Sequence, residues 1–546
     1  MQALFIKCLV ATLIFVGFIS YIWPPAIWLL VLVVPLGALG FYDMIQTKHS
    51  LRRNFPLYGR GRWYAEKLRP FIRQYFIESD TDGAPISRIF RNVVYQRSKK
   101  EIESVPFGTR LDTYRSGYEW FGHSLAAMDT TEINPDLRVK VGGPDCKQPY
   151  SASILNISAM SFGSLSSNAI LALNKGAKLG GFAHNTGEGG LSPYHLKNGG
   201  DIIWQIGTGY FGCRDNNGHF NPELFKEKTS IESVKMIEIK LSQGAKPGHG
   251  GILPAEKNTL EIAEIRGVEP YTQVNSPPAH SAFNTPLGLT AFIAQLRELS
   301  GGKPIGFKLA IGHKSEFIAI CKAMVKSGIT PDFITVDGGE GGTGAAPLEY
   351  TNSVGMPLRE AVAFVADSLN GFGIREKIKI IAAGKIISGF HLVKNMALGA
   401  DICNSARGMM LALGCVHSLI CNTNHCPSGV ATQNPKLVNG LDVSDKAVRV
   451  FNFHKNTVHA TAEVIASGNL SHTSALNRSH VYRRINQHEI KRYDQIFPYI
   501  QNNCLQEGNI RDDFKLIMEE SNADSFEPHI PLTRVGNETT KIEPLT

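Results

Sequence analysis

Three cysteines lie close together late in the chain. Cys415, Cys421 and Cys426 fall within twelve residues, whereas the other six of the nine cysteines are scattered singly. Thiolates are the ligands of iron–sulfur clusters, and a cluster that lacks one iron needs three of them. A zinc site with His417 or His425 as fourth ligand fits the same residues, and so do three isolated buried thiols. The residues alone leave all three interpretations open.

Stretches rich in glycine and polar residues follow several short apolar runs. They are Ser158–Ser166, Asn185–Gly190, Gln243–Gly251, Asn275–Pro278, Asp337–Ala345 and Ala383–Lys385. Glycine lets backbone N–H groups converge on an anion without a side chain in the way. The other interpretation is that these glycines only form tight turns. Several such stretches at successive strand ends favour anion binding.

Lys308 stands inside an otherwise apolar run, Ile305–Ile311. A buried ammonium needs an anionic partner. That partner is either the polar edge of an anionic cofactor such as a flavin or an acidic neighbour such as Asp337. Both interpretations predict that Lys308 points into a polar site.

The elements that would position these residues alternate between strand and helix. The predicted strands are Ile154–Met160, Phe182–Thr186, Met236–Ser242, Thr272–Ser276, Ile305–Ile311, Phe333–Asp337, Ile378–Ala383 and Asp401–Ala406. Eight such repeats favour a (β/α)8 TIM barrel, whose chemistry lies at the carboxyl ends of its strands. A doubly wound open sheet is the runner-up, but Ala159–Gly163 lacks the Gly-x-Gly-x-x-Gly turn that it would need.

The barrel prediction locates a phosphate site. In such barrels the loops after the seventh and eighth strands usually bind phosphate. We therefore expect a cofactor phosphate near Gly384, Lys385, Arg407 and Gly408.

At this point the sequence resembles a known family. Residues from about 150 to 435 are similar to the FMN-binding synthase domain of glutamate synthases. The shared motifs, in the family's order, are Ala-Met-Ser-Phe-Gly-Ser-Leu-Ser, Asn-Thr-Gly-Glu-Gly-Gly, Gln-Gly-Ala-Lys-Pro-Gly-x-Gly-Gly, Asn-Ser-Pro-Pro, Gly-Gly-Thr-Gly-Ala and Cys-Pro-x-Gly-Val-Ala-Thr-Gln. The resemblance implies bound FMN and a [3Fe–4S] cluster held by Cys415, Cys421 and Cys426, whose Cys-x5-Cys-x4-Cys spacing is the family's.

The resemblance also implies roles for individual residues. Glu188 would be the carboxylate that guides ammonia and exchanges protons, although it could instead favour the positive end of a helix. Lys246 would anchor a substrate carboxylate, and Lys308 would meet the polar edge of the flavin. The residues implied to bind FMN are Met160, Ser161, Asn185, Thr186, Gln243, Lys308, Gly338, Gly339, Gly341, Gly342, Thr343, Gly384, Lys385, Arg407 and Gly408.

The implied activity is an oxidoreductase reaction on CH–NH2 donors, of the EC 1.4 class. It is the reductive amination of a 2-oxo acid, 2-oxoglutarate to glutamate, or the reverse amine oxidation. Electrons would come from an unidentified donor, which could be a ferredoxin, a flavoprotein or a membrane quinone. The chain begins Met-Gln-Ala-Leu, so we expect no glutaminase domain of its own and ammonia as the nitrogen source.

Some features limit the resemblance. His249 and Ala279–Ser281 differ from the versions associated with the full-length enzymes, which leaves the 2-oxo acid open. The alternative function is a membrane-anchored electron carrier or redox sensor without turnover. Retention of Glu188, Lys246 and Lys308 together favours the enzyme, because a carrier needs only its cofactor sites. A hydroxy-acid oxidase or nucleotide dehydrogenase on the same barrel would not explain the three cysteines.

The N-terminal segment is apolar. From Cys8 to Tyr42 there is no charged residue, and Pro24-Pro25 interrupts the run, since proline breaks a helix. The sequence therefore predicts a transmembrane helical hairpin with spans of roughly 8–23 and 26–42. A cleaved signal peptide fits poorly, because the run is too long and no small-x-small cleavage site follows.

Positive charge is concentrated next to this segment. Between Lys48 and Lys100 there are 13 Lys and Arg against 4 Asp and Glu, a net charge of +9, whereas the whole chain carries +8. This asymmetry favours contact with anionic lipid headgroups and a cytosolic catalytic domain. Nucleic acid is the competing partner, but no recognition motif accompanies the charge.

Composition and these boundaries together give four predicted segments. With 43% hydrophobic and 19% charged residues the chain can bury a sizeable core. The nine cysteines are an odd number without the spacing of a disulfide framework, which favours a reducing compartment. The segments are a transmembrane hairpin at 1–45, a basic lead-in at 46–135, the barrel with its cysteines at 136–440, and a helical segment at 441–546. We expect its polar tail, from about residue 505, to be partly disordered.

Overall fold

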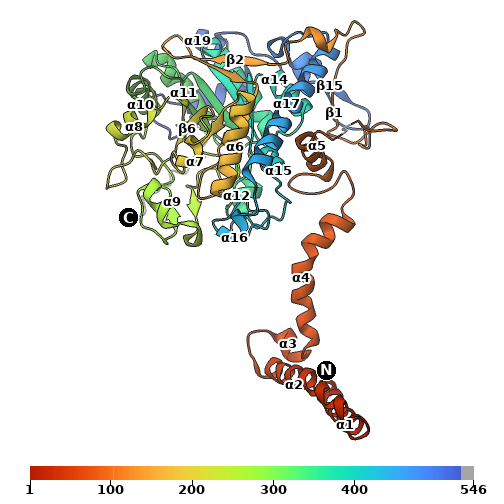
Figure 1. The fold of residues 1–546 in the computed structure, drawn as a ribbon. Coiled ribbons are helices and arrows are strands. Elements are labelled where there is room, and N and C mark those ends of the chain that lie inside the picture. Colours follow the sequence, from red (N-terminus) through yellow and green to blue (C-terminus); the bar gives the residue numbers. More distant parts are fainter. Residues whose placement is uncertain (102–103, 530–546) are drawn as a thin grey trace, which may run out of the picture. The chain divides into compact units, whose positions relative to one another are not determined.

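A computed structural model describes residues 1–101 and 104–529 of the chain. It separates into two compact units, Met1–Gly83 and the chain from Ala84 onward. Figure 1 shows the helices and strands of each unit.

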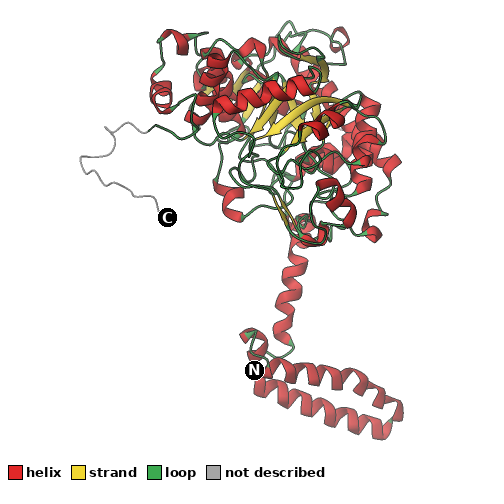
Figure 2. Cartoon of the chain, turned by 90° about the vertical axis from the view of Figure 1, so that its left-hand side faces the viewer, coloured by secondary structure: helices red, strands yellow, loops and turns green. Residues whose placement is uncertain are grey.

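The first unit begins with an antiparallel helical hairpin (Figure 2). Helix α1 (Gln2–Ile22) is followed by a tight turn of 3-10 helix that starts at Pro24 and continues into α2 (Leu30–Ile45). The two helices approach closely where α2 carries glycine, since a Cβ at Gly40 would lie 2.1 Å from the ring of Phe5. The spans of 21 and 22 residues are long and apolar enough to cross a membrane, although a signal sequence shares that length and composition.

An amphipathic helix follows the hairpin. After the short α3 (Ser50–Asn54), helix α4 (Gly61–Ile72) runs on into one π-helical segment, Arg73–Ile77. Large side chains at helical spacing are exposed along one side: Tyr64, Leu68, Phe71, Ile72 and Tyr75. Arg62, Arg69 and Arg73 recur at positions offset from this stripe.

The second unit is built on a closed barrel of eight parallel strands. In chain order they are β4 (Leu155–Ile157), β5 (His184–Asn185), β6 (Ile202–Ile206), β7 (Val234–Lys240), β10 (Ile305–Leu309), β11 (Phe333–Asp337), β12 (Lys379–Ala383) and β13 (Ile402–Ser405). The ring closes where β13 pairs with β4, through Cys403 and Leu155, Asn404 and Asn156, and Ser405 and Ile157. The prediction of a (β/α)8 barrel is confirmed.

One predicted strand is wrong and one barrel strand was missed. The predicted strand Thr272–Ser276 contains β9 (Val274–Asn275), which pairs only with β8 (Ile252–Leu253) in a two-stranded sheet outside the barrel. The missing barrel strand is β6, which begins only seventeen residues beyond the end of β5 (185 to 202). The helix between them, α7 (Pro193–Leu196), is a single turn, too short to give a helical period in the sequence.

Helices cover the outside of the barrel (Figure 2). Following the strands in order they are α6 (Ser167–Gly180), α7, α8 (Pro222–Thr229), α10 (Pro286–Leu299), α11 (Lys314–Ser327), α13 (Leu358–Gly371), α14 (Gly389–Ala397) and α17 (Val443–Ser467). Helix α17 packs against both α6 and α14, so it is the eighth barrel helix. The barrel therefore extends past residue 440, where the sequence suggested its end.

A hairpin occupies the amino-terminal end of the barrel. Strands β2 (Arg138–Val141) and β3 (Tyr150–Ser153) pair antiparallel. Their apolar side chains share a buried cluster with residues near the beginnings of barrel strands, including Met236 and Phe333. This end is filled by side chains, which leaves the carboxyl ends of the strands for a site.

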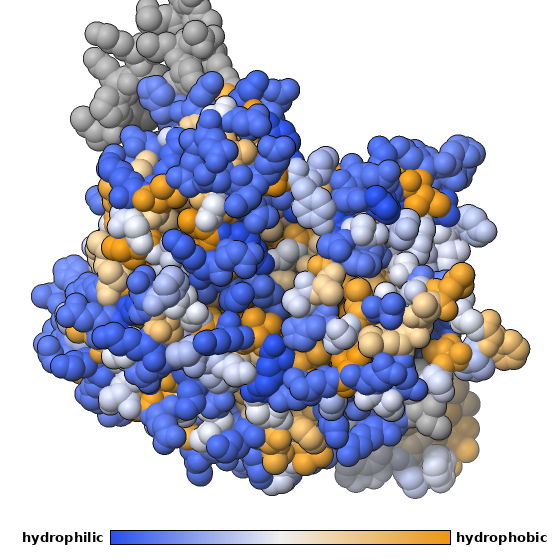
Figure 3. Space-filling model, turned by 90° about the horizontal axis from the view of Figure 1, so that it is seen from above, coloured by the Kyte–Doolittle hydropathy of each residue, from blue (hydrophilic) through white to orange (hydrophobic). Residues whose placement is uncertain are grey.

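Flanking segments pack on the same unit. Helix α5 (Arg88–Lys99) lies against α17, and β1 (Glu119–Phe121) pairs with β14 (Val481–Arg484), which also pairs with β15 (Ile490–Arg492). The exposed face in Figure 3 is largely hydrophilic, with apolar residues in separate patches.

The polar C-terminal segment is structured as far as residue 529. It contains α18 (Tyr493–Ile496), α19 (Cys504–Glu507) and α20 (Asp512–Glu520). Helix α20 packs on α11, where the Lys322 ammonium donates to the carbonyls of Met518 (2.7 Å) and Ser521 (2.9 Å). The part of the tail from about residue 505 to 529 is thus structured, and residues 530–546 lie outside the described part, so the expected partial disorder stays a prediction.

Candidate functional site

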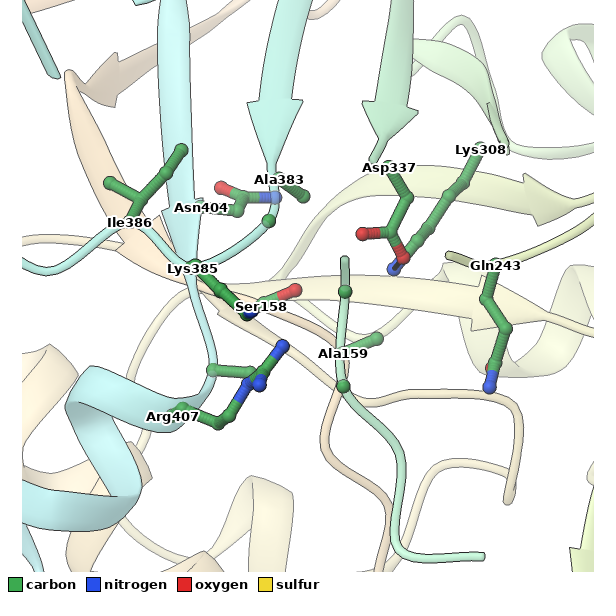
Figure 4. Close-up of a pocket in the computed structure, with 14 residues that line it drawn as sticks. Ser158, Ala159, Gln243, Lys308, Asp337, Ala383, Lys385, Ile386, Asn404 and Arg407 are labelled. Atoms are coloured by element: carbon green, nitrogen blue, oxygen red, sulfur yellow. Dashed lines mark ion pairs between the residues drawn. The ribbon is translucent and has the colours of Figure 1, made fainter. Parts of the chain in front are cut away.

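A cavity opens at the carboxyl ends of the barrel strands (Figure 4). Its lining comes from residues of four barrel strands, β10, β11, β12 and β13, and from the loops that follow β4, β7, β11, β12 and β13. The lining residues are Ser158, Ala159, Gln243, Lys308, Asp337, Gly341, Gly342, Ala383, Gly384, Lys385, Ile386, Asn404, Ala406 and Arg407. Seven residues that the sequence assigned to a cofactor are among them: Gln243, Lys308, Gly341, Gly342, Gly384, Lys385 and Arg407.

Lys308 forms a buried ion pair inside this cavity. Its Nζ lies 2.9 Å from Asp337 Oδ2, and the two side chains point toward each other in Figure 4. Burial alone would lower the pKa of Lys308, but Asp337 and then Glu238 outweigh it and raise that pKa. The acidic neighbour considered from the sequence is therefore present, and the ammonium remains charged in the cavity wall.

Asp337 also fixes the neighbouring loop. Its Oδ2 accepts the backbone N–H of Gly244 at 3.1 Å. A Cβ at Gly244 would lie 1.9 Å from the carbonyl oxygen of Gly338, so only glycine fits here. This contact brings the loop after β7 against the loop after β11, beside Gln243.

The other end of the cavity is basic. Two cationic side chains, Lys385 and Arg407, line it. Lys385 has a backbone φ of 50°, in the left-handed region, and Arg407 is the first residue of α15 (Arg407–Ala412). Partial burial and then the Arg407 guanidinium lower the pKa of Lys385. Arg407 donates to the backbone carbonyl of Glu340 at 2.7 Å. Two cations beside glycines at the ends of β12 and β13 suit an anionic group.

The remaining residues assigned to a cofactor surround the cavity but do not line it. They are Met160, Ser161, Asn185, Thr186, Gly338, Gly339, Thr343 and Gly408. Gly338 donates its N–H to the carbonyl of Ala383 (2.9 Å) and thereby joins two of the loops. A Cβ at Gly408 would lie 2.6 Å from Ser405 Oγ, which points to close packing at that glycine.

A second charged group lies around Glu188. Its Oε1 is 2.7 Å from Nζ of Lys240 at the end of β7, and the latter side chain is 7% exposed. Burial raises the pKa of Glu188, but Lys240, Lys246 and Arg266 together lower it. Glu188 is therefore an ionised carboxylate at neutral pH. It does not lie in the first turn of α7, whose N-cap is Ser192, so the helix-end interpretation is wrong.

Lys246 lies near this pair and is 2% exposed. Burial lowers its pKa to about 8, although Glu188 opposes the shift. Buried lysines with such values gain or lose a proton close to neutral pH. A Cβ at Gly251 would lie 2.5 Å from Glu188 Oε1, so the glycine-rich loop after β7 closes over the carboxylate.

In this region Arg266 was not singled out from the sequence, and His280 was noted only within the stretch Ala279–Ser281. The buried Arg266 donates to the carbonyl of Phe162 at 3.2 Å, and the His280 ring bonds the Lys240 carbonyl (2.9 Å) and the Tyr210 hydroxyl (3.0 Å). Burial lowers the pKa of His280 to about 4, so this ring is neutral. Only their positions in the fold, not a spacing in the sequence, identify them.

Glu238 is a buried carboxylate at the centre of the barrel. It accepts hydrogen bonds from Asn185 (2.8 Å), Gln205 (2.6 Å) and Thr335 (2.6 Å), which come from three other strands. Asn185 in turn accepts the N–H of Gly187 (3.0 Å), just before Glu188. The inward-facing polar residues therefore form one network beneath the site.

The three cysteines share the loop between α15 and the short α16 (Pro435–Val438). Cys426 is 4% exposed, and Cys415 and Cys421 are half-buried. Burial, and then the charges of Cys421 and Cys426, raise the pKa of Cys415 to about 12. Burial, and then the charge of Cys426, raise the pKa of Cys421. Burial also raises the pKa of Cys426, but hydrogen bonds from Ser428 and nearby backbone N–H groups outweigh it and lower that pKa.

The backbone of the cysteine loop is unusual. His417, Leu419 and Asn424 all have φ between 57° and 61°, in the left-handed region that non-glycine residues rarely adopt. Such residues cluster at sites where the surroundings hold the chain in a required shape. Across residues 1–101 and 104–529, no three His, Cys, Asp or Glu side chains gather as ligands of a single metal ion. The cluster interpretation and the zinc interpretation, with His417 or His425 as a ligand, therefore both stay predictions.

The cysteine loop is bonded to the loop after β4. Gln433 Nε2 donates to the carbonyls of Gly163 (3.0 Å) and Leu165 (2.9 Å). Ser166 donates its hydroxyl to the carbonyl of Gly429 at 2.7 Å. The stretch that follows Ser158 in the cavity wall is therefore held directly against the segment that follows Cys426.

Comparison with known proteins matches residues 112–470 to a family described as "Conserved region in glutamate synthase". The chain belongs to the glutamate synthase family. It is 38% identical over 482 residues to the glutamate synthase large subunit-like protein YerD of Bacillus subtilis (strain 168), covering 81% of this chain and 91% of that protein. An archaeal-type glutamate synthase [NADPH] of Thermotoga neapolitana is 34% identical over 434 residues, covering 76% and 79% of the two chains.

Solved structures of mandelate oxidase are more distant neighbours. One shares 14% identity at a TM-score of 0.41, covering 69% of this chain and 88% of that one. The assignment to the family rests on the family match and on the sequence relatives. They support an oxidoreductase related to glutamate synthase.

Proposed function

We propose that the barrel is an FMN- and iron–sulfur-dependent enzyme that reductively aminates a 2-oxo acid, 2-oxoglutarate in the first instance. The observation that carries the proposal is the ion pair of Glu188 with Lys240, with Lys246 nearby, in the same barrel mouth as the Lys308 cavity. An electron carrier would need the cofactor sites but not this second charged group.

The cavity suits FMN. Lys385 and Arg407 would hold its phosphate, and Gln243 and Lys308 would meet the polar edge of its ring, where reduction builds negative charge. Met160, Ser161, Asn185, Thr186, Gly338, Gly339, Gly341, Gly342, Thr343, Gly384 and Gly408 would shape the surrounding loops. The paired cations at one end and a buried ammonium at the other are the features that support this assignment.

The cysteine loop suits a [3Fe–4S] cluster. Cys415, Cys421 and Cys426 would each bind one iron, so their thiols need not converge on a single atom. Hydrogen bonds to Cys426 favour its thiolate form, and the His417 N–H lies 3.4 Å from Cys415 Sγ. When bound, FMN supplies two-electron chemistry and the cluster supplies single electrons.

The charged residues have distinct roles in this proposal. Protonated Lys246 binds a carboxylate of the 2-oxo acid. Neutral ammonia attacks the 2-oxo carbon, and the carbonyl oxygen takes up two protons and leaves as water, so that an imine forms for the two-electron reduction. Ionised Glu188 accepts a proton as the new C–N bond forms, and Lys240 keeps that carboxylate in place. The glycine-rich loop after β7 limits access of water to the carboxylate.

A turnover assay tests the proposal. The full-length protein, supplied with an artificial reductant and 2-oxoglutarate, should form glutamate with ammonium and not with glutamine. Efficient use of glutamine by this chain alone would contradict ammonia as the nitrogen source. Full FMN and cluster content without turnover of any 2-oxo acid or amine would instead favour the membrane-anchored electron carrier or redox sensor.

The electron donor is a separate question. Ferredoxin, a flavoprotein and a membrane quinone are the candidates from the sequence, and NADPH appears in the names of the archaeal-type relatives. Direct reduction of the purified protein by each, followed at the flavin absorbance, distinguishes them.

We also propose that the first unit anchors the protein in a membrane with the catalytic unit in the cytosol. Helices α1 and α2 have spanning length, and little of either apolar window is buried (6% and 17%). The stripe of exposed apolar side chains on α4, together with its arginines, suits the boundary between acyl chains and anionic headgroups.

A further inference from the structure

Lys257 has an ammonium that three different segments share. It ends the 3-10 turn Ala255–Lys257 after β8 and is 3% exposed. Its Nζ donates to the carbonyls of Ser164 (3.1 Å), Cys421 (2.8 Å) and Ala431 (2.9 Å). One buried charge therefore joins the loop after β4, the cysteine loop and the loop that carries Lys246.

This ammonium has no carboxylate partner among the described residues. Its three acceptors are neutral carbonyls, and one of them belongs to Cys421. Keeping a buried cation without a counter-charge is costly. The unbalanced charge is explained if an anionic group occupies the space between the cysteines.

We infer that Lys257 is the counter-charge of the iron–sulfur cluster and raises its reduction potential. The inference rests on the proposed function, because it requires the cluster. A cluster bound by three thiolates carries net negative charge, which grows by one when it is reduced. A fixed positive charge at Cys421 stabilises the reduced form more than the oxidised form.

Lys257 would also connect the cluster to the rest of the site. Ser164 lies in the same loop as Ser161, and the Ser161 hydroxyl donates to the Ser164 hydroxyl at 3.0 Å. Strand β8, which ends seven residues after Lys246, is followed by the turn that carries Lys257. Lys257 is accordingly a positioning residue: it touches neither substrate nor flavin, and acts on the cluster through charge and through the loop carbonyls.

Lys303 provides a matched control. It is 8% exposed and its Nζ donates to three carbonyls as well, of Thr229 (2.6 Å), Ile231 (3.2 Å) and Val234 (2.6 Å). Those acceptors precede or begin β7, at the opposite end of the barrel from the cysteine loop. Neutralising Lys303 removes a similar set of hydrogen bonds without touching the cluster.

The test is an EPR-monitored redox titration of the full-length protein carrying Lys257→Gln, Lys257→Arg or Lys303→Gln. Lys257→Gln keeps a donor but loses the charge, and should lower the reduced-to-oxidised ratio at the wild-type midpoint roughly tenfold, a shift of about 59 mV for a one-electron couple. Lys257→Arg should stay near the wild-type midpoint, and so should Lys303→Gln.

An unchanged midpoint in Lys257→Gln, or equal shifts in Lys257→Gln and Lys303→Gln, would overturn the inference while leaving the proposed function intact. Loss of the cluster in Lys257→Gln alone would support it, because the charge would then be needed to hold the cluster. Loss in all three variants would contradict it. A wild-type protein without any three-iron signal would overturn the cluster assignment itself, and this inference with it.

Discussion

Single side chains near Glu188 depend on one another for their charge. Glu188 is ionised because the positive charges of Lys240, Lys246 and Arg266 outweigh the effect of its burial. Burial lowers the pKa of Lys246 to about 8, and the negative charge of Glu188 opposes that shift. Changing one of these groups therefore changes the protonation of the others. Lys246, with a pKa of about 8, gains or loses a proton close to neutral pH.

Glu188→Gln should remove most of the amination activity, roughly 10²–10⁴-fold, because the amide cannot accept the proton. The flavin spectrum should stay unchanged, since Glu188 does not line the cofactor cavity. Glutamate formation and absorbance measured on the same preparation check both expectations. Glu264→Gln, an exposed position on α9 (Leu260–Arg266), serves as control and should behave as wild type. Full activity in Glu188→Gln would remove this residue from the mechanism.

Activity should also depend on the protonation of Lys246. With the concentration of free ammonia held constant, kcat/KM for the 2-oxo acid should fall as pH rises through about 8, because the neutral amine no longer binds the substrate carboxylate. In Lys246→Arg this decline should be absent, since guanidinium stays charged. The pH profile of each protein measures it, and a decline of the same shape in both would assign the titration to another group.

At the scale of elements, the strands with long apolar runs were predictable and the irregular connections were not. β10, β11 and β12 are buried on both faces, so their continuous apolar runs gave their positions nearly to the residue. β6 was missed because the single-turn helix α7 before it shows no helical periodicity in the sequence. The run around Val274 was predicted as a barrel strand because a short apolar run has the same pattern in a two-stranded sheet as in a barrel.

The candidate site divides in the same way. Gln243, Lys308, Lys385 and Arg407 line one cavity, as their places at strand ends indicated. Lys240, Glu238 and Lys257 escaped detection because each acts through partners far away in sequence. A lysine that donates to carbonyls in three loops has no local pattern.

The cysteine loop should be separable from the flavin cavity. Cys421→Ala should abolish the low-temperature EPR signal of an oxidised three-iron cluster while FMN is retained, because no cysteine lines the cavity in the part of the chain that the structure describes. EPR, iron and sulfide content and flavin content report the two sites. Stoichiometric zinc in place of iron and sulfide, in anaerobically prepared wild-type protein, would contradict the cluster.

Strand β1 is held to the barrel helices through one carboxylate. Glu119 forms ion pairs with Arg359 of α13, Lys394 of α14 and Arg483 of β14. Burial raises the pKa of Glu119, but Lys394 and Arg483 outweigh it and lower that pKa to about 2. The pairing stabilises the native state above the ordinary glutamate pKa, and this contribution is lost as pH falls from about 4.5 to 2.

Glu119→Gln should therefore lower the free energy of unfolding at pH 7 by roughly 3 kcal/mol. The difference from wild type should shrink as pH falls toward 2. Denaturant unfolding at pH 7 and at two acidic values measures it, with Glu132→Gln, outside this cluster, as control. A difference that is constant across pH would show that Glu119 contributes by packing and not by charge.

At the scale of the whole molecule, two units of different character share one chain. The first is an apolar hairpin with a basic amphipathic continuation, and the second is a barrel whose flanking segments pack back on it. Hydrophobic insertion and electrostatic attraction to a membrane respond differently to salt, which makes them separable.

The protein should stay with the membrane pellet through a high-salt wash, because salt screens the basic residues but does not weaken apolar spans. Deleting residues 1–45 should release it in the same wash. Fractionation with antibody detection measures both. Release of the full-length protein by salt alone would show that only the basic segment holds it.

The closure of the barrel sets an order in time. Because β4 pairs with β13, the first strand of the ring waits for a partner made about 250 residues later, roughly 12–50 s at ordinary rates of synthesis. Until then the nascent sheet has two open edges, which are sites for pairing with other chains. Any message that stops before residue 405 yields a product that can never close these edges. Such products are expected to aggregate or to be degraded. A chain synthesised past α17 can close the barrel and then has no open sheet edge in the ring.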